Sequence, residues 1–182
     1  MAVHQRNQQI RAGGILFDLE SHQQSDCWLG EFISVPSPYM STFLSLRNKQ
    51  VLLDVIHHFQ DVDLLLVEGA GKQHPRYFGL ACEIGVDLDI PTIGITKSSL
   101  WGEIDFSHSL YKEGFNYNIF PVYDKTLLIA YFIKKIGNKR GIFVSIGHKI
   151  SLETTLDIIL ALLVYRIPEP LRLVKKLLKE AD

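Results

Sequence analysis

The first part of the chain has the spacing of apolar and polar residues that is typical of strands. Residues 12–20 are dense in apolar side chains and are predicted to form one strand. Residues 28–35 are predicted to form its partner, across a polar turn at 21–26. Two prolines within residues 36–41 then interrupt the sheet. The pattern therefore predicts a β-hairpin that ends before residue 36.

The middle of the chain changes to helical spacing and then returns to strands. Apolar residues recur at helical intervals over residues 44–59, and Ser41 or Thr42 is a candidate N-cap for this helix. Two apolar strands are predicted at 63–67 and 91–95, with a short helix between them. This order predicts a strand–turn–helix–strand unit.

The last part of the chain opens with a loop at 101–117, which is rich in polar and aromatic residues and either contacts substrate or is a surface excursion. Three strands and two helices are predicted after it: 119–123, 127–134, 141–146, a helix over 151–165 that Ser151 opens, and a basic amphipathic helix after Pro168 and Pro170. Strands before, between and after helices predict an α/β, three-layer domain with a mixed sheet. Because no repeat or linker is evident, residues 1–182 are expected to form a single domain.

Composition adds the size of the core and the expected compartment. The chain has 182 residues, of which 47% are hydrophobic, enough for one sizeable core. No apolar run has the length of a membrane span, and the first residues lack a signal-peptide core. The two cysteines, Cys27 and Cys82, make neither a disulfide framework nor a metal motif. A cytoplasmic protein without membrane contact is expected.

Charge is unevenly divided along the chain. Residues 1–105 hold 13 acidic and 7 basic side chains, whereas residues 106–182 hold 7 acidic and 12 basic ones. A phosphate backbone would be attracted to the second part. The alternative is an ordinary solvated surface with a basic terminal helix, and composition alone favours it. The basic residues concerned are Lys134, Lys135, Lys139, Arg140, Lys149, Arg172, Lys175 and Lys176.

The candidate chemistry lies where the strand at 63–67 ends. Glu68 follows that strand at once, and Gly69 and Gly71 let another molecule approach the backbone. His74, Arg76 and Lys97 are predicted to converge on the same point. An ordinary unit whose glycines serve only the turns is the alternative for each glycine, and it is less favoured for the whole set.

The residues around this point resemble the endonuclease V family. That family carries Asp-Gly-x-Gly-x-x-His-Pro-Arg-x-x-Gly-x-Ala, and the chain reads Glu68-Gly69-Ala70-Gly71-Lys72-Gln73-His74-Pro75-Arg76-Tyr77-Phe78-Gly79-Leu80-Ala81. Further matches follow at 91–102, 144–152 and 166–172, in the family's order, so that the resemblance covers residues 38–172. It implies a ribonuclease H-like fold with a mixed central sheet.

The resemblance also implies a metal site in which carboxylates hold Mg²⁺ or Mn²⁺ for phosphodiester cleavage. The family supplies three carboxylates, and only Glu68 retains one here. The second position falls on Asn48, an amide, and the first falls near Val3 or His4, in a first strand that is expected to be truncated or eroded. Asp18 is the one candidate replacement. The metal site is therefore predicted to be degenerate.

The other residues that the resemblance assigns are largely retained. It gives catalytic roles to Glu68, His74, Lys97 and His148. A pocket of backbone and small residues would hold a flipped hypoxanthine base, with Tyr39 as the wedge that fills the space left by the base. On this reading, a β-branched side chain at Gly79 would take the place of the base. The substrate-binding residues would be Tyr39, Gly69, Gly71, Arg76, Gly79, Leu80 and Ala81.

These residues lead to three functional hypotheses. The first is a protein that binds DNA or RNA at inosine or deaminated purines, with cleavage weak or lost. The alternatives are a weak Mg²⁺- or Mn²⁺-dependent nuclease that cuts near inosine, and a non-catalytic subunit whose protein partner is an active relative.

Overall fold

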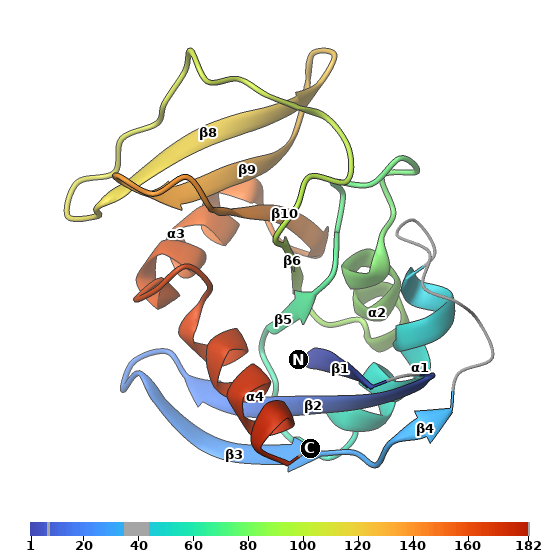
Figure 1. The fold of residues 1–182 in the computed structure, drawn as a ribbon. Helices are drawn as coiled ribbons and strands as arrows, with labels where there is room; N and C mark the ends of the chain where they lie inside the picture. Colours follow the sequence, from blue (N-terminus) through green and yellow to red (C-terminus); the bar gives the residue numbers. More distant parts are fainter. Residues whose placement is uncertain (7, 35–43, 182) are drawn as a thin grey trace.

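The structure is a computed structural model that describes residues 1–6, 8–34 and 44–181, apart from the side chain of Leu46. The first strands form an antiparallel sheet in which β2 is central (Figure 1). Its strands are β1 (Ala2–Arg6), β2 (Gln9–Asp18), β3 (Gln23–Leu29) and the short β4 (Ile33–Ser34), which pairs with β2. Residues 1–6, expected to retain little of a first strand, thus form β1, which pairs with β2 from Ala2 to Arg6.

A second sheet of six strands carries the predicted site. Its order is β5-β6-β10-β9-β8-β7, and only the β5–β6 pair is parallel, so that the sheet is mixed as predicted. The strands are β5 (Leu65–Glu68), β6 (Thr92–Thr96), β7 (Glu103–Ile104), β8 (Tyr117–Asp124), β9 (Leu127–Lys135) and β10 (Ile142–His148). The two sheets meet where the amide of Glu68 donates a hydrogen bond to the carbonyl of Met1, at 3.1 Å.

Four helices cover the sheets on two sides and complete the three layers. The helices α1 (Leu44–Ile56) and α2 (Leu80–Leu88) share one apolar cluster with Leu65 and Val67 of β5. The helices α3 (Leu152–Leu162) and α4 (Glu169–Glu180) share another with Leu66. Because side chains alternate along a strand, Glu68 is on the same side of β5 as Leu66 and faces α4.

The hairpin shows where the sequence-based prediction was wrong. The strand predicted at 28–35 overlaps the last two residues of β3, which begins at Gln23, and both residues of the short β4, while residue 35 lies outside the described residues. The turn is reduced to residues 19–22. Residues 23–27 are exposed, so their polar side chains resemble a turn although the backbone pairs with β2, with an irregularity at Ser25 where the register shifts. A strand at the solvent-facing end of a hairpin lacks the apolar alternation from which strands are predicted.

The other predicted elements are confirmed, with shifted ends. Ser151 caps α3 as predicted, because its hydroxyl accepts a hydrogen bond from the amide of Thr154 at 3.0 Å. This helix ends at Leu162 rather than at residue 165. The candidate N-caps of α1, Ser41 and Thr42, lie outside the described residues. No helix in the described part of the chain is long and apolar enough to cross a membrane.

Candidate functional site

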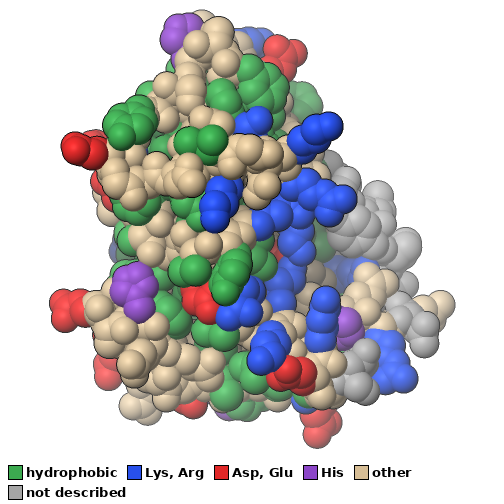
Figure 2. All heavy atoms as spheres, turned by 60° about the vertical axis from the view of Figure 1, so that its left-hand side comes forward, with side chains coloured by type: hydrophobic (Ala, Val, Ile, Leu, Met, Phe, Trp, Pro, Cys, Tyr) green, Lys and Arg blue, Asp and Glu red, His purple; other side chains and the backbone are tan. Residues whose placement is uncertain are grey.

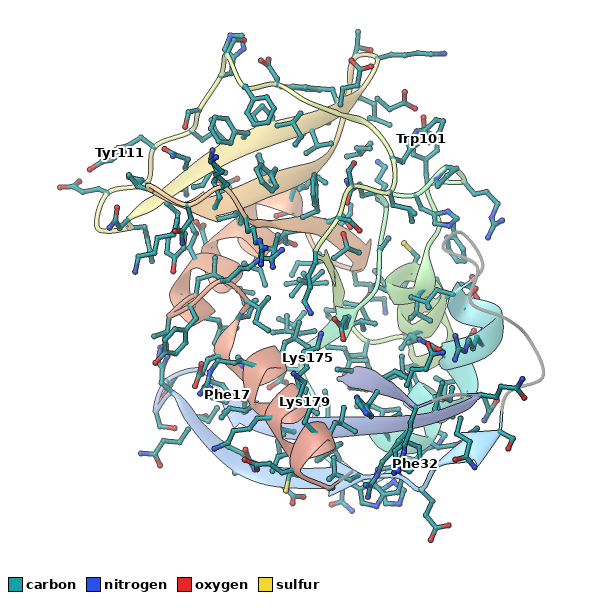
Figure 3. The ribbon with its side chains drawn as sticks, in the orientation of Figure 1. Phe17, Phe32, Trp101, Tyr111, Lys175 and Lys179 are labelled. Carbon is teal, nitrogen blue, oxygen red and sulfur yellow. The ribbon has the colours of Figure 1, made fainter. Side chains whose placement is uncertain are left out.

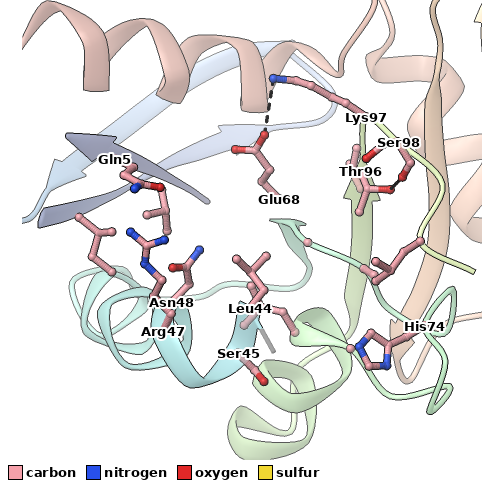
Figure 4. Close-up of a pocket in the computed structure, with 18 of the residues that line it drawn as sticks. Gln5, Leu44, Ser45, Arg47, Asn48, Glu68, His74, Thr96, Lys97 and Ser98 are labelled. Atoms are coloured by element: carbon pink, nitrogen blue, oxygen red, sulfur yellow. Dashed lines mark hydrogen bonds and ion pairs between the residues drawn. The ribbon is translucent and has the colours of Figure 1, made fainter. Parts of the chain in front are cut away.

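A pocket of about 420 Å³ lies where β5 and β6 end, between the first turns of α1 and α2 and the flank of α4 (Figure 4). The parallel pairing of β5 with β6 places Glu68 opposite Ile95, so the segments that follow both strands enter the same space. Glu68, His74 and Lys97 all line this pocket, as does Asn48. The structure therefore brings together three of the predicted catalytic residues and the position that the resemblance assigns to a second metal ligand.

Glu68 is held by two lysines. Lys175 of α4 donates a hydrogen bond to the Glu68 carboxylate. The ammonium of Lys97 lies 3.7 Å from the same oxygen, Oε1, a contact that Figure 4 marks. The side chain of Lys175 is 23% exposed and that of Lys97 is 47% exposed. Burial lowers the pKa of Lys175, and the neighbouring Glu68 carboxylate opposes this shift. Glu68 is thus the counter-ion of two cations.

A third cation enters the pocket from α1. Arg47 is buried and lines the pocket beside Asn48, which is buried as well. Among the described residues, the Nε atom of Arg47 is buried without a hydrogen-bond partner. A buried guanidinium nitrogen without a hydrogen-bond partner costs free energy, which the rest of the fold must offset.

This set of residues does not fit a divalent metal ion. Magnesium and manganese require several oxygen ligands with negative charge. Here the one carboxylate, Glu68, pairs with Lys97 and Lys175, Arg47 lines the same pocket, and the second ligand position is the amide of Asn48. The described residues contain no cluster of three or more His, Cys, Asp and Glu side chains suited to a metal. A pocket whose described lining holds three cationic side chains and one carboxylate is suited to an anion.

Asp18, the candidate replacement ligand, lies elsewhere. It ends β2 at the tip of the hairpin, where its carboxylate accepts hydrogen bonds from the amide and hydroxyl of Ser21, both at 2.6 Å. These bonds lower the pKa of Asp18. It lines a different pocket from Glu68, so it does not complete the carboxylate set at the end of β5.

The predicted base pocket is built on very close backbone contacts. Gly69, Gly79 and Leu80 line the pocket. The amide of Gly71 donates to the hydroxyl of Ser145 at 3.0 Å, and the amide of Ala81 donates to the carbonyl of Ala70 at 3.0 Å. These two amides therefore hold the turn in place, and the pocket wall is rigidly connected to β10 and α2.

The glycines also have a structural role, and their predicted role in binding the base stays a prediction. A Cβ atom on Gly79 would lie 2.4 Å from the carbonyl oxygen of Ala70, and one on Gly71 would lie 2.1 Å from that of Ile146. A side chain at Gly79 would thus collide with the main chain of Ala70 rather than simply fill the space for a base. The glycines are required because the backbone segments touch.

We expect Gly71→Ala to lower the free energy of unfolding by about 1–3 kcal/mol, because the turn must move away from β10. Gly114→Asn is the control: a Cβ there meets no atom within 4 Å, and Asn is one of the residues that adopt a positive φ, here 83°, most readily, so that only a small strain is expected. Urea unfolding followed by circular dichroism measures both. Equal stability of the two variants would contradict the close packing at Gly71.

His74 is buried in the pocket wall. Its Nδ1 atom accepts a hydrogen bond from the amide of Arg76 at 3.2 Å, which assigns the proton of the neutral imidazole to Nε2. The preceding residue, Gln73, donates a side-chain hydrogen bond to the carbonyl of Trp101 at 3.1 Å. This bond connects the turn that carries His74 to the loop after β6. Arg76 is exposed and does not line the pocket. A role for Arg76 in substrate binding stays a prediction.

His148, a predicted catalytic residue, does not line the pocket. His148 pairs with Thr92 at the opposite end of β6 from Lys97, and its Nε2 atom lies 3.3 Å from the carboxylate of Asp89. Asp89 has a lowered pKa because Lys149 and His148 both bond to it. The structure therefore separates His148 from Glu68. Tyr39, the predicted wedge, lies outside the described residues.

The chain has the ribonuclease H-like fold of several solved endonuclease V structures. Human ENDOV superposes with a TM-score of 0.81 at 23% identity, over 99% of this chain and 82% of that chain. Endonuclease V from Streptomyces avermitilis superposes with a TM-score of 0.80 at 26% identity, over 99% and 81%. The fold class predicted from the sequence is confirmed.

Sequence comparison then identifies the family. A sequence model of the Endonuclease V family matches residues 1–176, so the chain belongs to the endonuclease V family. It is 37% identical to endonuclease V of Ignicoccus hospitalis over 140 aligned residues, and the alignment covers 75% of this chain and 60% of that protein. It is 30% identical over 153 residues to endonuclease V of Homo sapiens, which covers 77% and 54%. The chain thus spans little more than half the length of these relatives.

Proposed function

We propose that this chain binds nucleic acid at inosine and related deaminated purines, with phosphodiester cleavage weak or lost. Family membership supports the recognition part of the proposal. The endonuclease V of Ciona intestinalis, which superposes with a TM-score of 0.76 at 23% identity, has been solved in complex with DNA that contains an inosine. The pocket beside Gly69, Gly79 and Leu80 is the candidate site for the base, on DNA or RNA.

The observation that carries the cleavage part is the ion pairing of Glu68. Its carboxylate, at the position of a family metal ligand, is the counter-ion of Lys97 and Lys175, and Arg47 adds a third positive charge to the pocket. A cluster of three cations repels a divalent metal ion and attracts a phosphate. The site therefore supports binding of the substrate better than metal-dependent cutting.

Metal-dependent cutting near inosine is the second candidate, and the comparisons favour it. The relatives described above are all named endonuclease V, and the chain keeps His74 and Lys97 in the pocket. On this view Mg²⁺ or Mn²⁺ would displace a lysine from Glu68. A third possibility, a subunit with a protein partner, predicts no binding of nucleic acid by the chain alone.

One titration separates these functions. Fluorescent oligonucleotides with a single inosine, and matched ones with adenosine, are titrated with the protein in EDTA and in Mn²⁺, and the products are run on denaturing gels. We expect tighter binding of the inosine strand in both buffers, with little product. Rapid cutting in Mn²⁺ would establish the second candidate, and absence of binding to either strand would reject both.

We also expect the affinity to fall steeply with salt. Each single-strand phosphate that a Lys or Arg neutralises contributes about −0.7 to the slope of log K against log salt concentration. The titration is repeated at several concentrations of KCl. An affinity that does not change with salt would exclude a phosphate-binding function for the pocket cations and for the basic half of the chain.

A further inference from the structure

The cations of the pocket come from three elements that are far apart in the sequence. Lys175 lies on α4, Lys97 follows β6, and Arg47 lies in α1. Glu68 is the carboxylate that Lys97 and Lys175 share. The pocket therefore holds more positive than negative side chains, and Arg47 Nε is a buried donor without an acceptor among the described residues. The excess of positive charge along the pocket favours the binding of an anion.

We infer that the cationic side chains of Arg47, Lys97 and Lys175 form an anion-binding cluster, called the cation site below. This cluster binds a backbone phosphate of the nucleic acid without any divalent metal. This inference rests on the proposed function and names the part of the ligand that the site receives, a phosphodiester monoanion. Glu68 keeps Lys97 and Lys175 in place before the ligand arrives. The phosphate takes over part of the positive charge that Glu68 balances in the free protein.

The surface beside the pocket supports this assignment. Arg172, Lys175 and Lys179 follow each other at helical spacing on α4, so they lie along one flank of that helix. Lys and Arg side chains gather in the middle of one face of the molecule (Figure 2), and Lys175 and Lys179 lie on successive turns of α4 (Figure 3). A strand that runs along this flank would bring a phosphate to Lys175 beside the pocket wall of Gly69 and Leu80.

The cation site is tested by comparing two neighbouring lysines. Lys175→Met removes the ammonium that contacts Glu68, whereas Lys176→Met removes an exposed one that pairs with Glu180 at 3.6 Å. Both variants and the unmodified chain are titrated with inosine and adenosine oligonucleotides, in EDTA and in Mg²⁺ at constant ionic strength. We expect Lys175→Met to weaken binding of both strands by roughly tenfold, and Lys176→Met by less than threefold. Mg²⁺ is not expected to tighten binding.

The outcomes of these titrations distinguish failure of the cation site from failure of the proposed function. Inosine preference that needs Mg²⁺, or an affinity for either strand that is the same in Lys175→Met as in Lys176→Met, would overturn the cation site and leave the proposed function standing. Equal binding of inosine and adenosine strands would overturn the proposed function, whereas the cation site would still be judged from the two lysine variants. No binding by the unmodified chain would overturn both.

Folding is controlled separately, because Lys175 is largely buried against Glu68. Thermal unfolding of each variant shows whether it is folded at the temperature of the titration. Lys97→Met gives an independent test, since the side chain of Lys97 is 47% exposed and its loss leaves Lys175 on Glu68. We expect Lys97→Met to weaken binding in EDTA by about fivefold. Unchanged affinity in folded Lys97→Met would contradict a shared cation site.

Discussion

Replacing Glu68 with Gln is expected to tighten the binding of inosine-containing oligonucleotides by about tenfold in EDTA. Glutamine keeps the shape of the side chain and one carbonyl oxygen that accepts a hydrogen bond from Lys175. It removes the negative charge with which a phosphate competes for Lys97 and Lys175. Fluorescence anisotropy of a labelled strand measures the change. The sign of the effect is informative, because loss of a metal ligand would weaken binding that depends on the metal.

Glu180→Gln is the matched control for this experiment. It makes the same change of charge on a carboxylate that also pairs with a lysine, Lys176, but it lies on the exposed end of α4. We expect its affinity to stay within threefold of the unmodified chain, because exposed charges are screened. Weaker binding by Glu68→Gln, together with Mg²⁺-stimulated binding of the unmodified chain, would favour the metal-dependent nuclease.

Much of this site was predictable, because it depends on local patterns. The apolar runs before Glu68 and Lys97 predict two buried strands, and those strands are parallel neighbours in the sheet. Their ends therefore meet, as the sequence indicated, and His74 joins them on the turn between. The alternation of side chains along β5 also settles which face Glu68 occupies, once Leu66 is known to pack against α3 and α4.

The contact between Glu68 and Lys175 was beyond such patterns. The two residues are 107 positions apart in the sequence. The apolar stripe of α4, formed by Leu171, Val174 and Leu178, predicts which side of the helix is buried. It does not specify which strand end the helix crosses, since that depends on how α4 packs across both sheets. Lys175 was therefore predicted only as one of many basic residues in the second part of the chain.

Arg47 was missed for a different reason. Arg47 directly precedes Asn48, and Asn48 is the residue at the position where the resemblance assigns a carboxylate. The sequence was therefore interpreted at Asn48, and Arg47 was not considered. Helical geometry turns successive residues by about 100° and favours one of the two for the pocket. In the structure both line the pocket and both are buried. The sequence signal that remains is an arginine in the first turns of an otherwise apolar helix face.

The largest gain in Mn²⁺ affinity is expected from a variant that restores the family's residue types at positions 48 and 68 and also removes the ammonium of Lys175. Asn48→Glu with Glu68→Asp restores the residue types that the family has at these two positions. We expect this double variant to bind Mn²⁺ hardly better than the unmodified chain, because Lys175 and Lys97 still direct positive charge at residue 68. Two like unit charges 4 Å apart repel each other by about 4 kcal/mol at an effective dielectric constant of 20. A repulsion of this size between a lysine and Mn²⁺ is enough to prevent weak binding of the metal. Adding Lys175→Met is expected to raise Mn²⁺ affinity at least tenfold, as measured by calorimetry.

Cleavage is expected to stay slow even in the triple variant. The first-strand position, near Val3 or His4 of β1, still supplies no carboxylate, so a metal would be held from two elements only. Metal-assisted phosphodiester hydrolysis requires metal that activates the attacking water and also stabilises the leaving oxygen. Two ligands do not hold metal well enough for both tasks. Gel assays of an inosine strand in Mn²⁺ test this, with the unmodified chain as reference. Vigorous cutting by the double variant, with Lys175 in place, would show that the lysines yield readily to a metal, and the nuclease function would then replace the binding function proposed here.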